Sequence, residues 1–309
     1  MAASKNRALW TELPAVTREM VEHLVGGSVI AAENCEGGYS PGLASKLTLA
    51  GCSRVFVKAI DCAEWPDQSA MYRDEAAVAA ALPAGLPTPR FLGSADDGQW
   101  FALAFECAAG TEPTQPWQRP QLDRVLTTVD WFAVAVTPSP ISVPSTQPRI
   151  GGWAEMTADS VARASLADHS QWAVNHLDDL ARLEQDGLAR ARGSTLVHFD
   201  LLPHNILMTD TEVLFVDWAH ARLGAPFIDL LMVLASAAAD GIDPEPILPG
   251  CDALASAGQV SVNAVLTALT GSWLAGGIAL MQPRLEPIGL AKLHLGLGAL
   301  SWLRRRLER

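Results

Sequence analysis

The sequence predicts an α+β protein with two lobes, a β-rich N-terminal lobe and an α-rich C-terminal lobe. Residues 30–107 form strand-like runs separated by turn signals, with one alanine-rich helical stretch among them. Residues 153–192 and 227–309 carry apolar residues at helical spacing. The segments 110–120 and 137–148, between these two regions, are rich in Pro, Thr and Ser, which indicates loops or a linker.

The N-terminal elements follow from local patterns. A helix is expected over Thr17–Val25, with Thr17 as a candidate cap. Residues 43–60 alternate like two strands around a turn at 51–54. Met71–Leu82 is rich in alanine and ends before a proline, which predicts a helix and its stop. Asp97-Gly98 then marks a hairpin between two further strands.

Composition excludes several classes of protein. The chain has 309 residues, 49% of them hydrophobic and 18% charged, so wholesale disorder is not expected. A net charge of −12 argues against a general nucleic-acid binder and would suit a cationic substrate.

The cysteines and the most apolar stretch indicate a cytoplasmic protein without a membrane anchor. Five cysteines are scattered with no C-x-x-C pair, so we expect reduced and mostly buried side chains, without disulfides or structural zinc. The stretch Phe227–Ile242 is interrupted by two aspartates and falls short of the ~20 residues that a membrane span needs.

A second hairpin carries the polar residues with the clearest chemistry. The short apolar runs NILM and VLFV are joined by a turn at Asp210-Thr211. Because a hairpin brings its open ends together, Asp200, Asn205 and Asp217 are expected to converge. Two carboxylates and an amide oxygen are ligands that suit Mg²⁺.

The spacing of these residues predicts phosphoryl transfer. Asn205 lies five positions after Asp200 and Asp217 lies twelve positions after Asn205, which matches H-x-D-x-x-x-x-N…D. In such sites one Asp accepts the proton of the attacking hydroxyl, while the Asn and the second Asp hold metal ions at the phosphates.

A lysine and a glutamate further upstream fit the same chemistry. Lys58 ends the apolar run VFVKAI, and Glu75 lies on the predicted helix that follows. Such a pair is expected to contact the phosphates of the nucleotide. Asp74 competes for the role of partner, but it lies about 100° away around the helix, and we choose Glu75.

These residues resemble the aminoglycoside phosphotransferase family, a branch of the protein-kinase-like fold. HFDLLPHNIL is similar to the family's H-G-D-x-x-x-x-N-[VIL]-L, and VDWAHARLGAPFIDLLMV to its D-[WFY]…G-x-P-x-x-D-L-A. AFECAAG resembles the hinge between the lobes, and GGYSPGLASKL resembles the loop that covers the phosphates. The resemblance spans roughly residues 30–240.

The resemblance implies a bilobal kinase-like fold, with a nucleotide-binding lobe at residues 1–107 and a catalytic and acceptor-binding lobe at 108–309. It implies ATP and Mg²⁺ as cofactors. For catalysis, it implies Asp200 as the catalytic base, Asn205 and Asp217 as metal ligands, and His198 as the residue that orients the catalytic loop. For the nucleotide, it implies Lys58 on the α- and β-phosphates with Glu75 as its partner, Ser40 near the tip of the phosphate loop, and the Glu106 carbonyl and Ala108 N–H on the adenine edge. Asp229 is implied to be a structural residue.

One departure from the family pattern concerns the catalytic loop. Phe199 stands where the family usually has Gly, a residue that permits a free backbone conformation or close packing. The sequence leaves open the effect of this substitution, and it leaves open the choice between ATP and GTP.

Three other interpretations compete with this one. Residues 38–42 fit G-x-S-x-G, the nucleophile elbow of α/β-hydrolases, but the strand-like stretch that follows does not fit the helix this motif opens. His198, Asp200, His204, Asp217 and His220 could form a hydrolytic Zn²⁺ site. A pseudokinase would bind nucleotide without transfer, although Lys58 and the three loop residues are all intact.

The predicted function is therefore ATP-dependent phosphorylation of a small-molecule hydroxyl. The acceptor could be a cationic antibiotic such as an aminoglycoside, a metabolite alcohol or an amino sugar. No nucleic-acid or membrane partner is expected, and the protein is expected to be a monomer or homodimer.

Overall fold

The computed structural model describes residues 7–35, 41–143, 150–283 and 285–309. Its described part divides into two compact units. Among the described residues, unit 1 holds 7–35, 41–112, 140–143 and 204–221, and unit 2 holds 113–139, 150–203, 222–283 and 285–309. The lobe boundary at residue 107 stays a prediction. The predicted fold class is confirmed, since the chain combines a five-stranded antiparallel sheet with a helical C-terminal part.

The sheet of unit 1 has the strand order β1-β2-β3-β5-β4, and all its neighbours are antiparallel. The two strands predicted within residues 43–60 and the hairpin at Asp97-Gly98 are confirmed. The strands are β1 (Val29–Asn34), β2 (Leu43–Leu49), β3 (Arg54–Asp61), β4 (Phe91–Asp96) and β5 (Trp100–Glu106).

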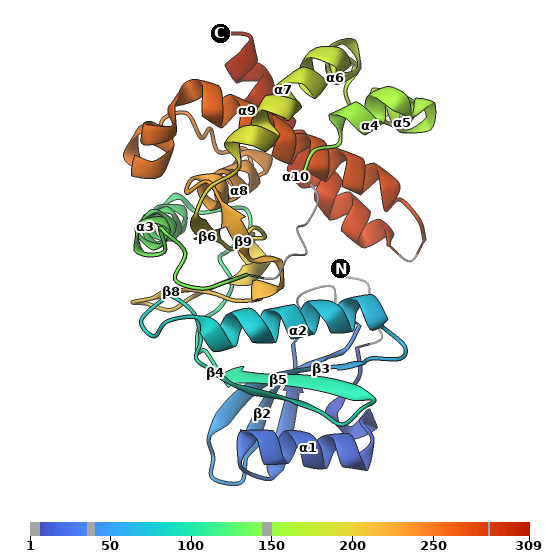
Figure 1. The fold of residues 1–309 in the computed structure, drawn as a ribbon, viewed down its shortest axis with the longest axis vertical. Helices are drawn as coiled ribbons and strands as arrows, with labels where there is room; N and C mark the ends of the chain where they lie inside the picture. The colour runs from blue at the N-terminus through green and yellow to red at the C-terminus, as the bar shows by residue number, and fades with distance from the viewer. Residues whose placement is uncertain (1–6, 36–40, 144–149, 284) are drawn as a thin grey trace. The chain divides into compact units, whose positions relative to one another are not determined.

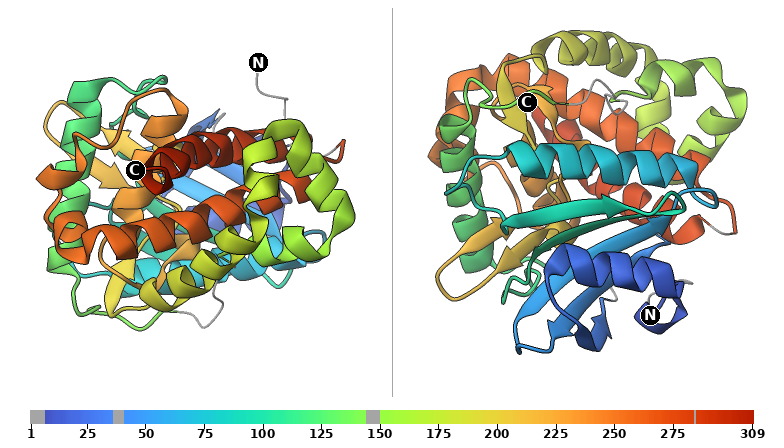
Figure 2. Two further views of the ribbon diagram at one scale, coloured as in Figure 1. Left: turned by 90° about the horizontal axis from the view of Figure 1, so that it is seen from above. Right: turned by 60° about the horizontal axis from the view of Figure 1, so that its bottom comes forward.

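Helices α1 (Ala15–Val25) and α2 (Pro66–Ala81) cover opposite faces of this sheet (Figures 1 and 2). Successive side chains of a strand point to opposite faces, so both faces of β5 are buried. Ala102 and Ala104 pack in the cluster of α1, and Leu103 packs in the cluster of α2. The sheet is therefore the middle layer of unit 1.

The start of α1 corrects one expectation. The helix begins at Ala15 after Pro14, so Thr17 lies inside it and is not its cap. The Thr17 hydroxyl instead donates a 2.7 Å hydrogen bond to Asp97 at the β4–β5 turn. Thus the buried threonine ties α1 to the sheet.

The second predicted hairpin is confirmed and also belongs to unit 1. Strands β7 (Ile206–Met208) and β8 (Val213–Phe215) pair antiparallel around the predicted turn. Short 3₁₀ turns flank them at Pro203–Asn205 and at Trp218–His220, the latter labelled η3. Thr111, beyond the end of β5, exchanges two backbone hydrogen bonds of 3.0 and 2.7 Å with Met208. These bonds join the hairpin to the segment after the sheet.

Unit 2 is helical apart from one pair of short strands. The pair β6 (Thr195–Val197) and β9 (Arg222–Gly224) was not predicted, and neither was α3 (Arg119–Ala135). The predicted helical regions are confirmed as α4 (Trp153–Ala158), α5 (Ser160–His169), α6 (Gln171–Asn175), α7 (Leu177–Arg190), α8 (Ile228–Ala239), α9 (Asp252–Ala279) and α10 (Glu286–Leu307).

Glycines let the helices of unit 2 approach closely. A Cβ at Gly187 on α7 would lie 2.1 Å from the Ala264 carbonyl oxygen on α9. A Cβ at Gly298 on α10 would lie 2.3 Å from the Cα of Ala239 at the end of α8. Helices α9 and α10 run side by side in both figures, and their contact forms much of this core.

Helix α9 is, within the described ranges, the one helix long and apolar enough to cross a membrane. However, 67% of its most apolar window is buried in the structure. Core helices of soluble proteins have the same length and composition.

The cysteines are all free, as expected, but their burial was predicted wrongly. Only Cys251 is buried, while Cys52 is exposed and the other three are intermediate. Four of the five directly follow a strand of the sheet or lie in a turn between two of its strands, where local pattern does not determine burial.

The buried Glu184 of α7 should be a main support of unit 2. Its carboxylate accepts hydrogen bonds from the backbone N–H groups of Gly152, Trp153 and Ala154, at 2.6, 3.0 and 3.3 Å, where α4 begins. We expect Glu184→Ala to lower the free energy of unfolding by about 3 kcal/mol, because it leaves buried donors without an acceptor. Urea denaturation followed by circular dichroism measures this loss.

Asp186→Ala on the same helix is the matched control, since Asp186 forms a partly exposed ion pair with Arg190. It should cost less than about 1 kcal/mol. Equal losses in the two variants would contradict the role of Glu184.

A second prediction concerns Glu245, which holds the C-terminal helix α10. Its carboxylate accepts a 2.7 Å hydrogen bond from the Trp302 indole and pairs with Arg306 and Arg309. Burial acts to raise the pKa of Glu245, but the Trp302 hydrogen bond and the arginines outweigh it and hold the pKa below its ordinary value of 4.5.

A carboxyl whose pKa is lowered on folding contributes stability above its unfolded pKa and loses that contribution as the pH falls through its folded pKa. We therefore expect wild type to be more stable than Glu245→Gln at pH 7, with the gap closing as the pH falls below about 4.5. Thermal melts of both proteins between pH 7 and pH 3.5 test this, and a gap independent of pH would contradict it.

Candidate active site

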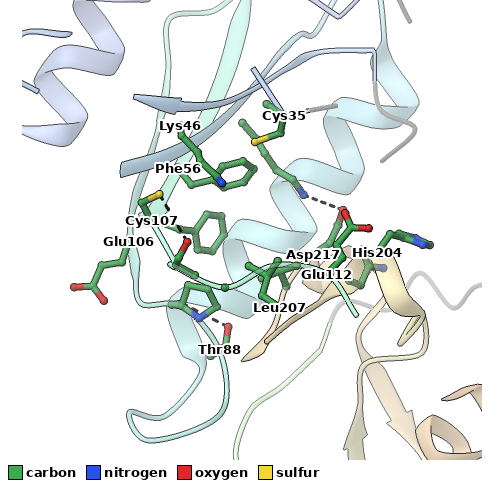
Figure 3. Close-up of a pocket in the computed structure, with 18 of the residues that line it drawn as sticks. Cys35, Lys46, Phe56, Thr88, Glu106, Cys107, Glu112, His204, Leu207 and Asp217 are labelled. Atoms are coloured by element: carbon green, nitrogen blue, oxygen red, sulfur yellow. Dashed lines mark hydrogen bonds and ion pairs between the residues drawn. The ribbon is translucent and has the colours of Figure 1, made fainter. Parts of the chain in front are cut away.

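A cavity of about 810 Å³ lies within unit 1 (Figure 3). Its walls come from β1, β2, β3 and α2, from the segment after β5, and from the β7–β8 hairpin. Six residues to which the family resemblance assigns a role line it: Lys58, Glu75, Glu106, Ala108, Asn205 and Asp217.

Lys58 reaches this cavity because of its place on β3. Its neighbours Val57 and Ala59 pack in the cluster of α1, so Lys58 points to the face that α2 covers. There its Nζ donates to both carboxylate oxygens of Glu75, at 3.0 and 2.8 Å. The Nζ also lies 3.1 Å from Oδ2 of Asp217.

The three charged side chains differ in exposure. The side chains of Lys58 and Glu75 are 11% and 1% exposed, whereas that of Asp217 is 42% exposed. Burial alone would lower the pKa of Lys58, but the charges of Asp217 and Glu75 outweigh it and raise that pKa above its ordinary value. Lys58 is therefore a fixed positive charge in the cavity wall.

Glu75 experiences opposing effects. Its burial raises its pKa, and the adjacent ammonium of Lys58 opposes that shift. Since both of its oxygens accept hydrogen bonds from Nζ, the geometry is that of an ion pair.

Asn205 and Asp217 are brought together by the backbone of the hairpin. The Val216 N–H donates a 3.0 Å hydrogen bond to the Asn205 carbonyl oxygen, which places Asp217 one residue from that contact. Asp217 has a left-handed backbone, with φ of 67°, which few non-glycine residues adopt. Next to it, the Trp218 indole donates to the Thr88 hydroxyl at 3.1 Å. Both site residues offer oxygen donors to the same cavity, a set that fits a hard divalent cation.

The segment after β5 presents its backbone to the cavity. The carboxylate of Glu106 pairs with Arg90 and points away from the cavity in Figure 3. Glu106 and Ala108 therefore line the cavity chiefly through their main chain.

Several lining residues were missed by sequence reasoning. Phe56 and Phe105 are paired in register on β3 and β5 and give the cavity an apolar wall. Glu112, whose pKa is raised by burial, also lines it (Figure 3), as does His204, which the sequence singled out only for the alternative zinc site. The period-two pattern of β3 could have suggested Phe56, since it lies two residues before Lys58 on the same face.

The remaining predicted residues lie elsewhere. Ser40 lies outside the described residues. Asp200 belongs to unit 2, so its convergence with Asn205 and Asp217 stays a prediction. The backbone just before Asp200 is held by the buried Asp229, which accepts hydrogen bonds from the N–H groups of His198 and Phe199 at 2.8 and 2.9 Å. Burial raises the pKa of Asp229 to about 6, and these two hydrogen bonds oppose the shift.

Two alternative interpretations gain nothing from the structure. No cluster of three or more His, Cys, Asp or Glu side chains suited to a metal occurs in the ranges that are described, so the zinc site has no support there. The G-x-S-x-G stretch lies largely outside those ranges, but Leu43 after it begins strand β2 and not the helix that a nucleophile elbow requires.

Comparison of folds agrees with a kinase-like architecture. A choline/ethanolamine kinase family protein from Mesorhizobium loti superposes with a TM-score of 0.52 at 13% identity, covering 97% of this chain and 96% of that one. The macrolide 2'-phosphotransferase MphH from Brachybacterium faecium gives 0.51 at 15% identity, covering 91% and 98%. Amicoumacin kinase hAmiN, in complex with AMP-PNP, Ca²⁺ and Ami, gives 0.50 at 13% identity, covering 88% and 89%.

At such low identity these structures establish the fold alone. No curated protein sequence matches the chain. The model of the phosphotransferase enzyme family, however, matches residues 33–264, which include strands β2 to β5 of the sheet, the hairpin and the loop around Asp200. This match confirms the predicted family and the predicted class of enzyme: the chain belongs to the phosphotransferase enzyme family.

Proposed function

We propose that this phosphotransferase moves the γ-phosphoryl group of ATP to a hydroxyl group of a small molecule. The observation that carries the proposal is Lys58, held between Glu75 and Asp217 in the wall of a cavity that Asn205 also lines. A fixed cation beside oxygen ligands is what a polyphosphate with its metal ion requires.

The nucleotide would occupy this cavity. Phe56 and Phe105 offer an apolar surface to the flat base, and the Glu106 carbonyl and Ala108 N–H would pair with the adenine edge. Lys58 would contact the α- and β-phosphates, and Glu75 would hold its ammonium in place. Ser40, in the loop before β2, would lie near the phosphates.

Asn205 and Asp217 would hold Mg²⁺. When bound, the ion would neutralise charge on the phosphates. The amicoumacin kinase solved in complex with AMP-PNP and Ca²⁺ supports a nucleotide and a divalent metal in this fold.

Asp200 would act as the catalytic base. Its carboxylate would orient the acceptor hydroxyl and take its proton while the hydroxyl oxygen bonds to the γ-phosphorus. The bond from that phosphorus to the bridging oxygen breaks, and ADP leaves with the bonding electrons. Asp229 would support this step by holding the backbone before Asp200.

For the acceptor we propose an amino-bearing alcohol. The net charge of −12 favours a cationic small molecule, and the similar folds include kinases of antibiotics and a choline/ethanolamine kinase family protein. An aminoglycoside-like antibiotic, a metabolite alcohol and an amino sugar are the candidates to be tested. Five free cysteines agree with action in a reducing compartment such as the cytoplasm.

Replacement of the proposed base separates transfer from binding. Asp200→Asn should lower ADP release by at least about 100-fold, because it removes the proton acceptor. The increase in Tm on addition of MgATP should persist, since the cavity lies in unit 1 and Asp200 in unit 2. A coupled ADP assay over a panel of amino-bearing antibiotics and amino alcohols, with thermal melts, measures both.

A wild-type protein that binds MgATP but forms no phosphorylated product from any of these acceptors would favour the pseudokinase alternative. Full ADP release by Asp200→Asn would remove Asp200 from the mechanism. Exposed Asp210 at the hairpin turn provides a matched control, and Asp210→Asn should keep wild-type activity.

The Lys58–Glu75 pair gives a prediction for stability. Glu75→Leu should lower the free energy of unfolding by about 3–5 kcal/mol, because it leaves the buried ammonium of Lys58 without its main partner. The double variant Lys58→Met/Glu75→Leu should recover much of that loss, since it removes both charges. Both variants should lose the MgATP-induced increase in Tm, as the cation is misplaced or absent. Additive losses in urea denaturation would contradict the coupling.

A further inference from the structure

Phe199 adopts a backbone conformation that its residue type disfavours. Its φ is 64°, in the left-handed region, where a bulky side chain is a clear outlier. Such a residue is strained and persists only where its surroundings enforce its conformation. Because Phe199 directly precedes Asp200, whatever enforces this conformation also directs the Asp200 carboxylate.

One enforcing contact comes from the backbone side. Asp229, in the first turn of α8, accepts the N–H groups of His198 and Phe199 through its two different oxygens. These bonds fix the peptide plane on the N-terminal side of Phe199. They do not fix the position of the Phe199 ring, which needs a second contact to hold it.

The ring is held by Arg222. The guanidinium carbon of Arg222 lies 3.6 Å from the centre of the Phe199 ring, close enough for a stacked cation–π contact. Both residues are buried. Arg222 opens β9 opposite Val197 of β6, so the strand pair fixes where its side chain begins.

The charge of Arg222 also faces the loop. Burial lowers the pKa of Arg222 to about 9, while the carboxylates of Asp229 and Asp200 act to raise it. The guanidinium therefore stays charged at neutral pH, and the charges of both the residue that holds the loop and the residue proposed as base act on it.

We propose that Arg222 is a positioning residue for Asp200, which it directs by clamping the ring of Phe199 in the left-handed turn before the catalytic carboxylate. This inference rests on the proposed role of Asp200. It assigns to Arg222 and Phe199 together the conformational task that a glycine would otherwise fulfil alone.

The test is a double-substitution cycle on the full-length protein. Arg222→Met keeps a long side chain over the ring but removes the charge and the planar group. Phe199→Gly removes the ring and lets the backbone adopt positive φ freely. Arg304→Met is the matched control, because Arg304 lies over the Trp172 ring, 5.7 Å from its centre, elsewhere in unit 2.

Each protein is assayed for Tm and for steady-state ADP release from MgATP, with water as acceptor. We expect Arg222→Met to lower kcat by at least about tenfold, with the KM for ATP changed less than about threefold, because a displaced base slows transfer without altering the nucleotide cavity. In the Phe199→Gly background, Arg222→Met should lower both kcat and Tm by clearly smaller amounts than it does in the wild-type background. Arg304→Met should leave kcat unchanged.

Equal effects of Arg222→Met on Tm in the two backgrounds would overturn the clamp. If Arg222→Met lowers Tm but leaves kcat unchanged, Arg222 contributes only to packing, and its positioning role is overturned. Asp200→Asn is run in parallel: if it releases ADP as wild type does, the proposed function fails at Asp200 and the positioning role fails with it, while the Tm cycle still decides separately whether Arg222 clamps Phe199.

Discussion

The burial of one lysine constrains the whole of unit 1. An ammonium group removed from water is costly unless carboxylates surround it, and Lys58 meets this need with Glu75 from α2 and Asp217 from the end of β8. Three separate segments of the chain must therefore meet at one point. The positions of α2 on the sheet and of the hairpin beside it follow from the same requirement that shapes the cavity.

Much of this fold could be predicted because its signals are local. The strands of residues 43–60, the Asp97-Gly98 hairpin and the β7–β8 hairpin each carry alternation and a turn within a few residues. The predictions were wrong or missing where contacts between residues distant in sequence determine the structure. Thr17 resembles a cap in sequence, but its hydroxyl bonds to Asp97, 80 residues further on. The β6–β9 pair joins strands too short to show a period, and the exposure of the cysteines depends on which elements cover them.

The residues of the site also divide into those that local sequence patterns predict and those that depend on tertiary contacts. The fixed spacing of Asn205 and Asp217 on one hairpin, and of Lys58 and Glu75 on a strand and the helix after it, is visible in sequence because each pair is connected by a short element. Phe105 enters the cavity wall only through its register with Phe56, and Glu112 only through the path of the chain after β5. Such residues carry no motif of their own, so a one-dimensional pattern does not reveal them.

Phe199 shows how a loop can keep the conformation of its motif although one residue of the motif is replaced. In sequence, Phe in place of Gly removes the residue best suited to a left-handed turn, and the expected result would be a different loop. The turn is nevertheless present, with φ of 64°, because two contacts outside the loop enforce it: Asp229 on the backbone and Arg222 on the ring. The conformation of the motif is therefore retained, although Phe199 replaces its glycine. Since that conformation now depends on α8 and β9, the geometry of the loop before Asp200 is coupled to the packing of unit 2 more strongly than a glycine would make it.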